Sequence, residues 1–219
     1  MKTPIETLYE DAEYIVFNKP AGLLVVPSPH HESDTLVHRV NEQLKNSSMK
    51  LYPCHRLDRD TSGLILFAKG KSNQERMMEI FKQRQIKKKY IAFVQGKIDQ
   101  RVGELKGMIC NPHDRPKPGQ PAGKLAITRY KVVEIRKHFS IVDVEPLTGR
   151  TNQIRIQFKE IGHPLVGERK YAFARDYALK FRRTALHAQS LEWIQPVTRK
   201  KIQITCDVAK DMQEFLKKN

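Results

Sequence analysis

The chain has 219 residues, of which 39% are hydrophobic and 29% are charged, a composition typical of one globular domain with a sizeable core. It contains no run of about 18 apolar residues that could span a membrane, and its acidic N-terminus lacks the features of a signal peptide, so we expect a cytoplasmic protein with no membrane role. The three cysteines lie far apart and no His or Cys pair has metal-ligand spacing, which argues against a disulfide framework and a metal site.

The positive charge is unevenly distributed along the chain. The formal net charge is +16, yet residues 1–50 carry five basic and seven acidic side chains, so the remaining residues carry 35 basic and 17 acidic ones, a net charge of +18. Such a basic surface favours a polyanionic partner, and the release of counterions from phosphates makes nucleic acid the first candidate. An acidic lipid surface is less favoured, because no basic amphipathic helix is apparent.

The N-terminal half of the chain alternates apolar runs with turns. An apolar residue recurs every four positions over residues 36–44, behind polar residues 33–34, which predicts an amphipathic helix with a polar cap. Ser72 and Glu75 form a capping-box pattern, which predicts a second helix that ends in the basic stretch 87–89. Strands are predicted for residues 14–17, 64–68 and 90–94.

The C-terminal half begins with an irregular segment. Residues 107–124 contain four prolines and three glycines, which predicts a cationic loop that either orders on RNA or is a solvated excursion. Thr151 is the predicted cap of a short helix with Ile154, Phe158 and Ile161 on its buried stripe, ended by Gly162 and Pro164. The remaining predicted elements are strands over residues 126–135, 139–144, 186–194 and 202–206, and a helix over residues 211–218.

The predicted strands outnumber the helices and do not alternate with them regularly. This order indicates an α+β fold, in which a largely antiparallel mixed sheet is flanked by helices and loops, with residues 1–219 as one domain.

The segment Cys54–Leu64 places one carboxylate, Asp58, between Arg56 and Arg59. Nearby positive charge favours the ionised form of a carboxyl group, so Asp58 could act as a nucleophile or a base. Taken alone, the pattern also fits an exposed charged turn, in which an arginine pairs with Asp58 or with Asp60.

The same segment resembles the H-R-L-D-x-x-T-S-G motif of RluA-type pseudouridine synthases at every defined position. Further stretches fit that family in the same order, at residues 18–23, 88–90, 149–155 and 162–167. The resemblance runs from about Leu8 to His187 and therefore implies a whole pseudouridine synthase catalytic domain. It also implies an isomerase that needs no cofactor. Because a strand is predicted as early as Tyr14, we expect no S4 module of the kind that many family members carry.

The resemblance assigns roles to three residues. Asp58 would be the catalytic carboxylate, as a nucleophile or as the base that yields a glycal. Tyr90 would stack on the extruded base, and Arg155 would pair with the catalytic carboxylate. Ile154 would either join the core or line the base pocket.

The expected partner is structured RNA, such as a stem-loop of rRNA or tRNA, bound by a monomer. Arg56 would fill the space of the flipped base or bind phosphate. The other expected RNA contacts are His55, more as a structural hydrogen-bonding group than as a base, and Lys19, Arg59, Lys88, Lys89 and Arg150. The sequence departs from the family at Asn152, Gln157 and Gln195, where many relatives have histidine, and we expect altered substrate preference from these changes. The alternative function is a non-catalytic RNA-binding or ribosome-associated protein on a synthase fold.

Overall fold

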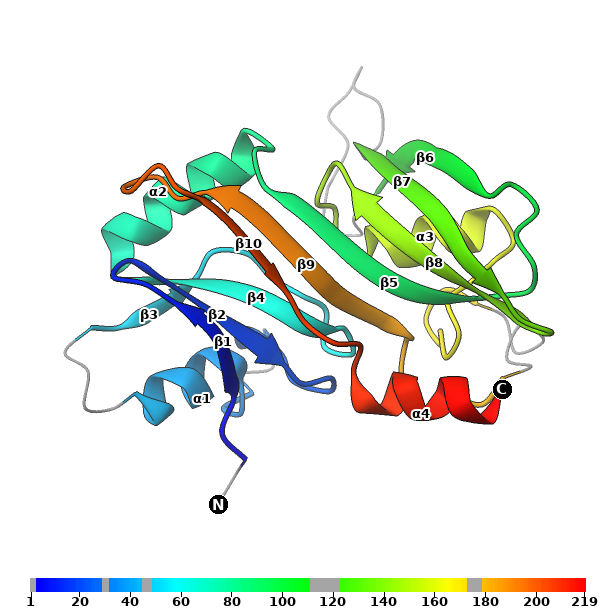
Figure 1. The fold of residues 1–219 in the computed structure, drawn as a ribbon, viewed down its shortest axis with the longest axis horizontal. Coiled ribbons are helices and arrows are strands. Elements are labelled where there is room, and N and C mark those ends of the chain that lie inside the picture. Colours follow the sequence, from blue (N-terminus) through cyan, green and yellow to red (C-terminus); the bar gives the residue numbers. More distant parts are fainter. Residues whose placement is uncertain (1–2, 29–31, 45–48, 111–122, 173–178) are drawn as a thin grey trace. The chain divides into compact units, whose positions relative to one another are not determined.

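The computed structural model describes residues 3–28, 32–44, 49–110, 123–172 and 179–219. The chain forms two compact units, one from residues 1–88 and 187–209 and the other from residues 89–186 and 210–219 (Figure 1). No helix in the described ranges is long and apolar enough to cross a membrane.

The first unit is built on strands paired in the order β1, β2, β4, β9, with β3 added to β4 and β10 added to β9. Each pairing is antiparallel except that of β4 with β9, which run parallel. The bounds are β1 Glu6–Glu10, β2 Tyr14–Lys19, α1 Leu36–Gln43, β3 Leu51–Pro53, β4 Ser62–Lys69, α2 Lys71–Lys82, β9 Leu186–Ile194 and β10 Lys201–Thr205.

Strands β2 and β4 form the centre of this unit because their apolar runs are continuous. A strand with apolar residues on both faces must be covered on both. On one face, Tyr14 and Leu66 pack in a core cluster with Trp193. On the other face, Phe17 and Phe67 meet edge to face with ring centroids 5.5 Å apart. The loop between β3 and β4, which carries Asp58, therefore precedes a fully buried strand.

In the described part of the second unit, strands pair antiparallel in the order β5, β8, β7, β6. Helix α3 packs on this sheet through Ile154 and Phe158, which belong to one core cluster with Ala92 and Val142. Helix α4 contributes Phe215 to a group of aromatic rings. The bounds are β5 Lys87–Gln95, β6 Val102–Ile109, β7 Lys124–Ile135, β8 Phe139–Pro146, α3 Gln153–Glu160 and α4 Lys210–Lys218.

The predicted α+β class with a largely antiparallel mixed sheet is confirmed. The strands predicted at 14–17, 64–68 and 186–194 correspond to β2, β4 and β9. The strands predicted at 126–135 and 139–144 are the paired strands β7 and β8. The assignment of residues 1–219 to one domain stays a prediction.

Several predicted element ends are wrong. Helix α2 begins after Gly70, without a side-chain cap, so the Ser72 and Glu75 pattern is not a capping box but lies inside the helix. The basic stretch 87–89 opens strand β5, because alternate side chains of a strand can point to solvent. The cap of α1 is Thr35, whose hydroxyl accepts from the amide of His38 at 3.4 Å, and not residues 33–34.

The helix predicted from Thr151 also begins later. Its N-cap is Asn152 in a left-handed conformation, and Ile161 follows its last turn with 40% of its surface exposed, so Ile161 is not part of the buried stripe. The predicted loop at 107–124 is shorter at its start, because residues 107–109 belong to β6. Most of that loop, residues 111–122, lies outside the described residues.

Candidate active site

The loop that carries Asp58 is held by backbone contacts within the first unit. The amide of Thr61 donates to the carbonyl of Asp58 at 3.2 Å, which closes a tight turn, and the amide of Gly22 donates to the carbonyl of Arg59 at 2.9 Å. Asp58 itself is half-buried. The turn therefore fixes the backbone of the carboxylate-bearing residue against the segment that follows β2.

The prediction that Lys19 contacts RNA is wrong, because its side chain is buried inside the protein. Its side chain is 0% exposed, and its ammonium donates to the carbonyl oxygens of Pro20, Leu23 and Arg59 at 2.9, 2.6 and 2.9 Å. A buried ammonium is stable only when such partners replace its hydration. Lys19 therefore ties the end of β2 to the Asp58 loop from inside the protein, where RNA cannot reach it.

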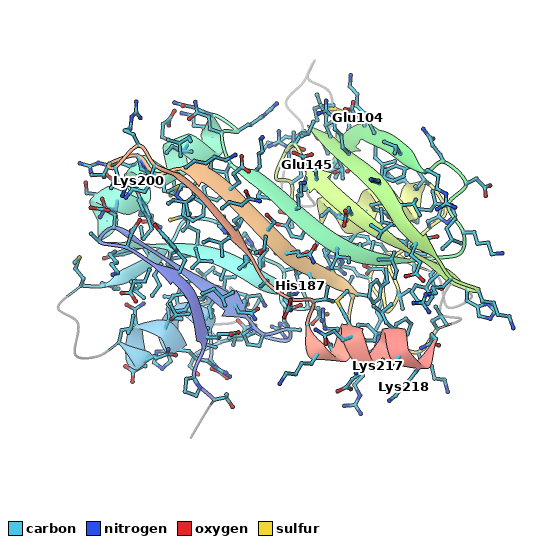
Figure 2. All side chains as sticks on the ribbon, in the orientation of Figure 1. Glu104, Glu145, His187, Lys200, Lys217 and Lys218 are labelled. Carbon is cyan, nitrogen blue, oxygen red and sulfur yellow. The ribbon has the colours of Figure 1, made fainter. Side chains whose placement is uncertain are left out.

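The Thr-Ser-Gly end of the motif is explained by the parallel pairing of β4 with β9. Gly63 lies opposite Ala188 with φ of +104°, and a Cβ on Gly63 would lie 2.2 Å from the carbonyl oxygen of Ala188. Only glycine permits this approach. The hydroxyl of Ser62 lies 2.8 Å from Nδ1 of His187, a buried histidine on β9 (Figure 2), so the motif's last residues lock β4 to β9.

His55 forms a hydrogen bond within the protein, which fits the expectation of a structural hydrogen-bonding group. Its Nε2 accepts from the amide of Leu66 at 3.0 Å, and its ring lies 5.0 Å from that of Phe81. Burial and the charge of Lys88 lower the pKa of His55 to about 3. The ring is therefore neutral at physiological pH and braces the start of the motif against β4.

The other expected RNA contacts of this unit differ in how far they reach solvent. Arg56 is exposed and its side chain has no hydrogen-bond partner among the described residues. Arg59 is also exposed but forms an ion pair with Glu32 at 3.0 Å. Lys88 is half-buried over the ring of Phe81, and burial lowers its pKa. Arg56 is thus the motif cation best placed to meet a ligand.

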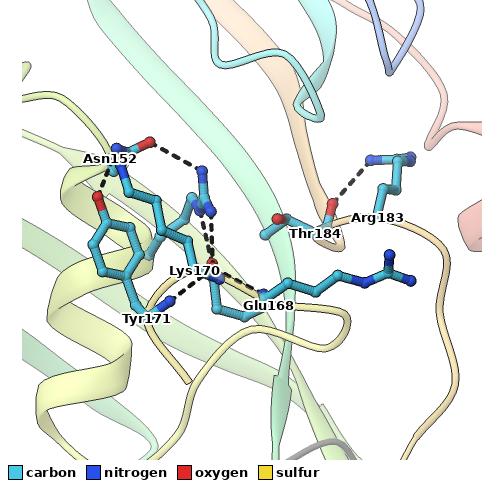
Figure 3. A network of polar contacts seen from close by, with 8 residues as sticks. Asn152, Glu168, Lys170, Tyr171, Arg183 and Thr184 are labelled. Atoms are coloured by element: carbon cyan, nitrogen blue, oxygen red, sulfur yellow. Dashed lines mark hydrogen bonds and ion pairs between the residues drawn. The ribbon is translucent and has the colours of Figure 1, made fainter. Parts of the chain in front are cut away.

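In the second unit, Arg155 lies at the centre of a polar network that the sequence did not reveal (Figure 3). Its Nε and Nη2 donate to the two carboxylate oxygens of Glu168 at 2.7 and 2.8 Å, and its Nη1 donates to Oδ1 of Asn152 at 3.0 Å. Nδ2 of Asn152 donates to the hydroxyl of Tyr171 at 2.7 Å. Glu168 was missed because the surrounding Gly-Glu-Arg-Lys sequence reads as an exposed charged turn. The buried residues before it, Leu165 and Val166, were the available signal.

Two buried glutamines anchor the helix that presents Arg155. Gln153 donates to the carbonyl of Ile127 at 3.0 Å, and Gln157 donates to the carbonyls of Leu105 and Ala126, both at 3.1 Å. Gln157, one of the departures from the family pattern, therefore holds α3 to β6 and β7. This packing role gives no support to the expectation that Gln157 changes substrate preference.

The remaining expected site residues of this unit lie at the core edge and at a cavity. Ile154 is 6% exposed and belongs to the core cluster, against which half-buried Tyr90 packs. A cavity of about 190 Å³ opens beside Asn152 and Tyr171, and its basic lining residues are Lys124, Arg150 and Lys170. Lys89 is exposed on β5. Arg150 and Lys89 therefore stay predicted RNA contacts, whereas Ile154 serves the packing of the core.

Residues 13–160 match the family model described as RNA pseudouridylate synthase. The chain is 36% identical over 204 residues to the dual-specificity RNA pseudouridine synthase RluA of Haemophilus ducreyi, and the aligned residues cover 89% of each chain. It is 30% identical to the uncharacterized RNA pseudouridine synthase YhcT of Bacillus subtilis, over 96% of this chain and 71% of that protein. The solved structure of human RNA pseudouridylate synthase domain containing 4 has the same fold, with a TM-score of 0.79, 23% identity, and coverage of 96% of this chain and 91% of that one. The chain therefore belongs to the RluA family of RNA pseudouridine synthases.

Proposed function

We propose that Asp58 is the catalytic carboxylate of this RNA pseudouridine synthase and that its substrate is one uridine in a stem-loop of rRNA or tRNA. The observation that carries the proposal is the fixed backbone of the Asp58 loop, in which the carbonyl of Arg59 accepts a hydrogen bond from the buried ammonium of Lys19. A reacting group needs such a rigid mount, because small displacements of a catalytic group cost large factors in rate.

The reaction requires one carboxylate and no external group donor. The C1′–N1 bond of the uridine breaks, the base turns, a C1′–C5 bond forms, C5 loses its proton and N1 gains one. Asp58 either attacks C1′ and forms a covalent sugar ester or removes a sugar proton to give a glycal. Both routes end with the same isomer and with the carboxylate regenerated.

Two residues of the second unit would assist Asp58. By the family resemblance, Arg155 pairs with the catalytic carboxylate and keeps it ionised, and a guanidinium held by its other donors suits that task. Tyr90 would stack on the extruded uracil with the face of its ring. These assignments rest on the motif positions, and each requires its own variant.

The target base must leave its stack before it can react, at a cost of a few kcal/mol. We propose that Arg56 fills the vacated space, since it is exposed and a planar guanidinium stacks well on bases. Lys89 and Arg150 would bind phosphates. The relatives named as dual-specificity synthases support recognition of a local shape shared by more than one RNA. We further propose that the protein acts as a monomer in the cytoplasm.

Tritium release tests the proposal. RNAs labelled at C5 of uridine, as minimal stem-loops and as full-length tRNA and rRNA, are incubated with the protein, and the modified position is mapped. We expect tritium to be released from a short stem-loop at one position. Release from assembled ribosomal particles alone would contradict local recognition, and an absence of release from all RNAs would favour the non-catalytic RNA-binding alternative.

A further inference from the structure

The carboxylate of Glu168 is buried and fully surrounded by donors. Its side chain is 0% exposed. Besides the fork of Arg155, its Oε1 accepts from the amides of Arg169, Lys170 and Tyr171 at 3.1, 2.8 and 3.3 Å. Burial tends to raise the pKa of Glu168, but the hydrogen bonds and charge of Arg155, together with the amide donors, outweigh it and lower the pKa. Glu168 is therefore an anion at neutral pH.

Glu168 and its neighbours fix Arg155 from three sides. The carboxylate takes two N–H groups, Asn152 takes a third, and the ring of Tyr171 lies 5.3 Å from the guanidinium carbon. A guanidinium has five N–H donors. These contacts use three of them, so the direction of the guanidinium is determined by Glu168 and Asn152.

Glu168 is itself mounted rigidly. The amide of Val166 donates to the carbonyl of Phe93 on β5 at 2.8 Å, and the amide of Ala185 donates to the carbonyl of Val166 at 2.9 Å. Gly167 has φ of +77°, and a Cβ there would lie 2.0 Å from the carbonyl oxygen of Arg183, so this segment lies directly against its neighbour. The backbone of Arg155 belongs to α3, whereas its side-chain direction is set by a segment attached to β5.

A buried ion pair of this kind contributes little net stability, since desolvation of both charges offsets their attraction. What it does supply is a fixed direction. We infer that Glu168 is a positioning residue for the reaction, which holds the guanidinium of Arg155 in the orientation required by the catalytic carboxylate. This inference rests on the proposed function, in which Arg155 pairs with that carboxylate.

The main test is Glu168→Gln, which keeps the size of the side chain but removes its charge and one acceptor. We expect kcat on the stem-loop to fall by about tenfold or more, since a misplacement of about 1 Å can cost about 10²-fold, while KM stays within about twofold. Without Glu168, the charge of Arg155 is no longer compensated and lowers the pKa of its partner carboxylate. The acid limb of the pH–rate profile should therefore move to lower pH.

Asp211→Asn is the matched control. Asp211 also accepts two hydrogen bonds from one arginine, Arg183, at 2.6 and 2.8 Å in the same unit, but its side chain is 47% exposed and its hydrogen bonds do not involve Arg155. This variant should lower the melting temperature and leave kcat and the pH profile unchanged. If Glu168→Gln behaves in the same way, the inference is overturned and Glu168 is only structural.

Glu168→Asp covers the case in which the Gln variant does not fold. It keeps the charge but shortens the side chain, so we expect a folded protein with lower kcat and unchanged KM. Wild-type kcat in this variant would contradict the inference. In the Arg155→Lys background, which lacks the fork, Glu168→Gln should lower kcat by less than in the wild type, because its effect passes through Arg155. An equal fold-change in both backgrounds would overturn the inference.

Asp58→Asn in the same assay separates this inference from the proposed function. If Asp58→Asn is inactive and Glu168→Gln has wild-type kcat, the positioning role alone fails. If Asp58→Asn turns over at the wild-type rate, the proposed catalytic carboxylate is wrong and so is the role inferred for Glu168.

Discussion

The replacement of Lys19 by Met removes the ammonium from beneath the Asp58 loop and keeps most of the aliphatic side chain. Three carbonyl oxygens, those of Pro20, Leu23 and Arg59, then lose a charged donor, and of these three contacts the one with Leu23 is buried. The substitution therefore tests whether this lysine supports the loop or binds RNA.

The expected loss follows from the contacts. A hydrogen bond to a charged group contributes about 1.5–3 kcal/mol, and an unsatisfied buried acceptor costs about 1–3 kcal/mol. The three contacts share one donor group and are not additive, and the desolvation cost of the buried ammonium is recovered. We expect the free energy of unfolding to fall by about 3 kcal/mol, which leaves most domains folded at 25 °C.

Urea unfolding measures that loss, and the salt dependence of RNA affinity measures phosphate contacts. Each lost contact reduces the slope of log K against log salt by about 0.7–0.9. Lys19→Met should keep the wild-type slope, because the ammonium is buried. Lys89→Met makes the same substitution at an exposed position, where we expect a change in stability within about 0.5 kcal/mol. A Lys19→Met protein with wild-type stability and a reduced slope would refute the structural role and restore the RNA contact.

Three further predictions concern packing, pH and metals. Gly63→Ala should prevent the pairing of β4 with β9, because its Cβ would lie 2.2 Å from the carbonyl oxygen of Ala188. The control is Gly22→Ala, at a position with φ of +83° and open space around it, where we expect the free energy of unfolding in urea to fall by only about 1–2 kcal/mol. An equal loss of unfolding free energy in both variants would show that the close approach at Gly63 is unimportant. The pKa of His55 is lowered from 6.5 to about 3 in the folded protein. Below pH 6.5 the unfolded state therefore binds more protons than the folded state, and the stability that neutral His55 contributes above that pH is lost as the pH falls toward 3. The loss is at most about 1.4 kcal/mol per pH unit. Melting temperatures from pH 7 to pH 4 should therefore depend less on pH in His55→Gln than in the wild type, and identical profiles would argue against a neutral His55 in the folded state. Turnover should survive exhaustive treatment with EDTA, because no sequence pattern offers metal-ligand spacing; a loss restored by one divalent ion, with the RNA fold unchanged, would contradict this.

The sequence predicts this fold where local pattern and burial agree. Residues 64–68 form a continuous apolar run, and the structure buries them completely in β4. Strand β6, by contrast, was not predicted, because its residues alternate between exposed and half-buried and include two glycines, so that its pairing with β7 decides its conformation. The predicted start of α2 is wrong because Ser72 and Glu75 match a capping pattern two positions after the actual N-cap, Gly70.

In the candidate site, too, features set by neighbouring residues can be predicted and features that depend on distant residues cannot. The motif around Asp58 can be recognised from sequence because its residues are contiguous. The burial of Lys19 could not be predicted, because it depends on carbonyl oxygens up to 40 positions away. For the pairing of Glu168 with Arg155 the sequence offers only an indirect signal, the apolar residues before Glu168, because the contact depends on the attachment of that segment to β5.

The most direct test of the account compares Asp58→Asn with Asp60→Asn, two substitutions of the same type in one loop, under single-turnover conditions with a stem-loop labelled at C5. The account predicts no detectable tritium release from Asp58→Asn, with RNA affinity within a few-fold of the wild type, and near wild-type release from Asp60→Asn. Release by Asp58→Asn at the wild-type rate, or an equal loss in both variants, would contradict the assignment of Asp58 as the catalytic carboxylate.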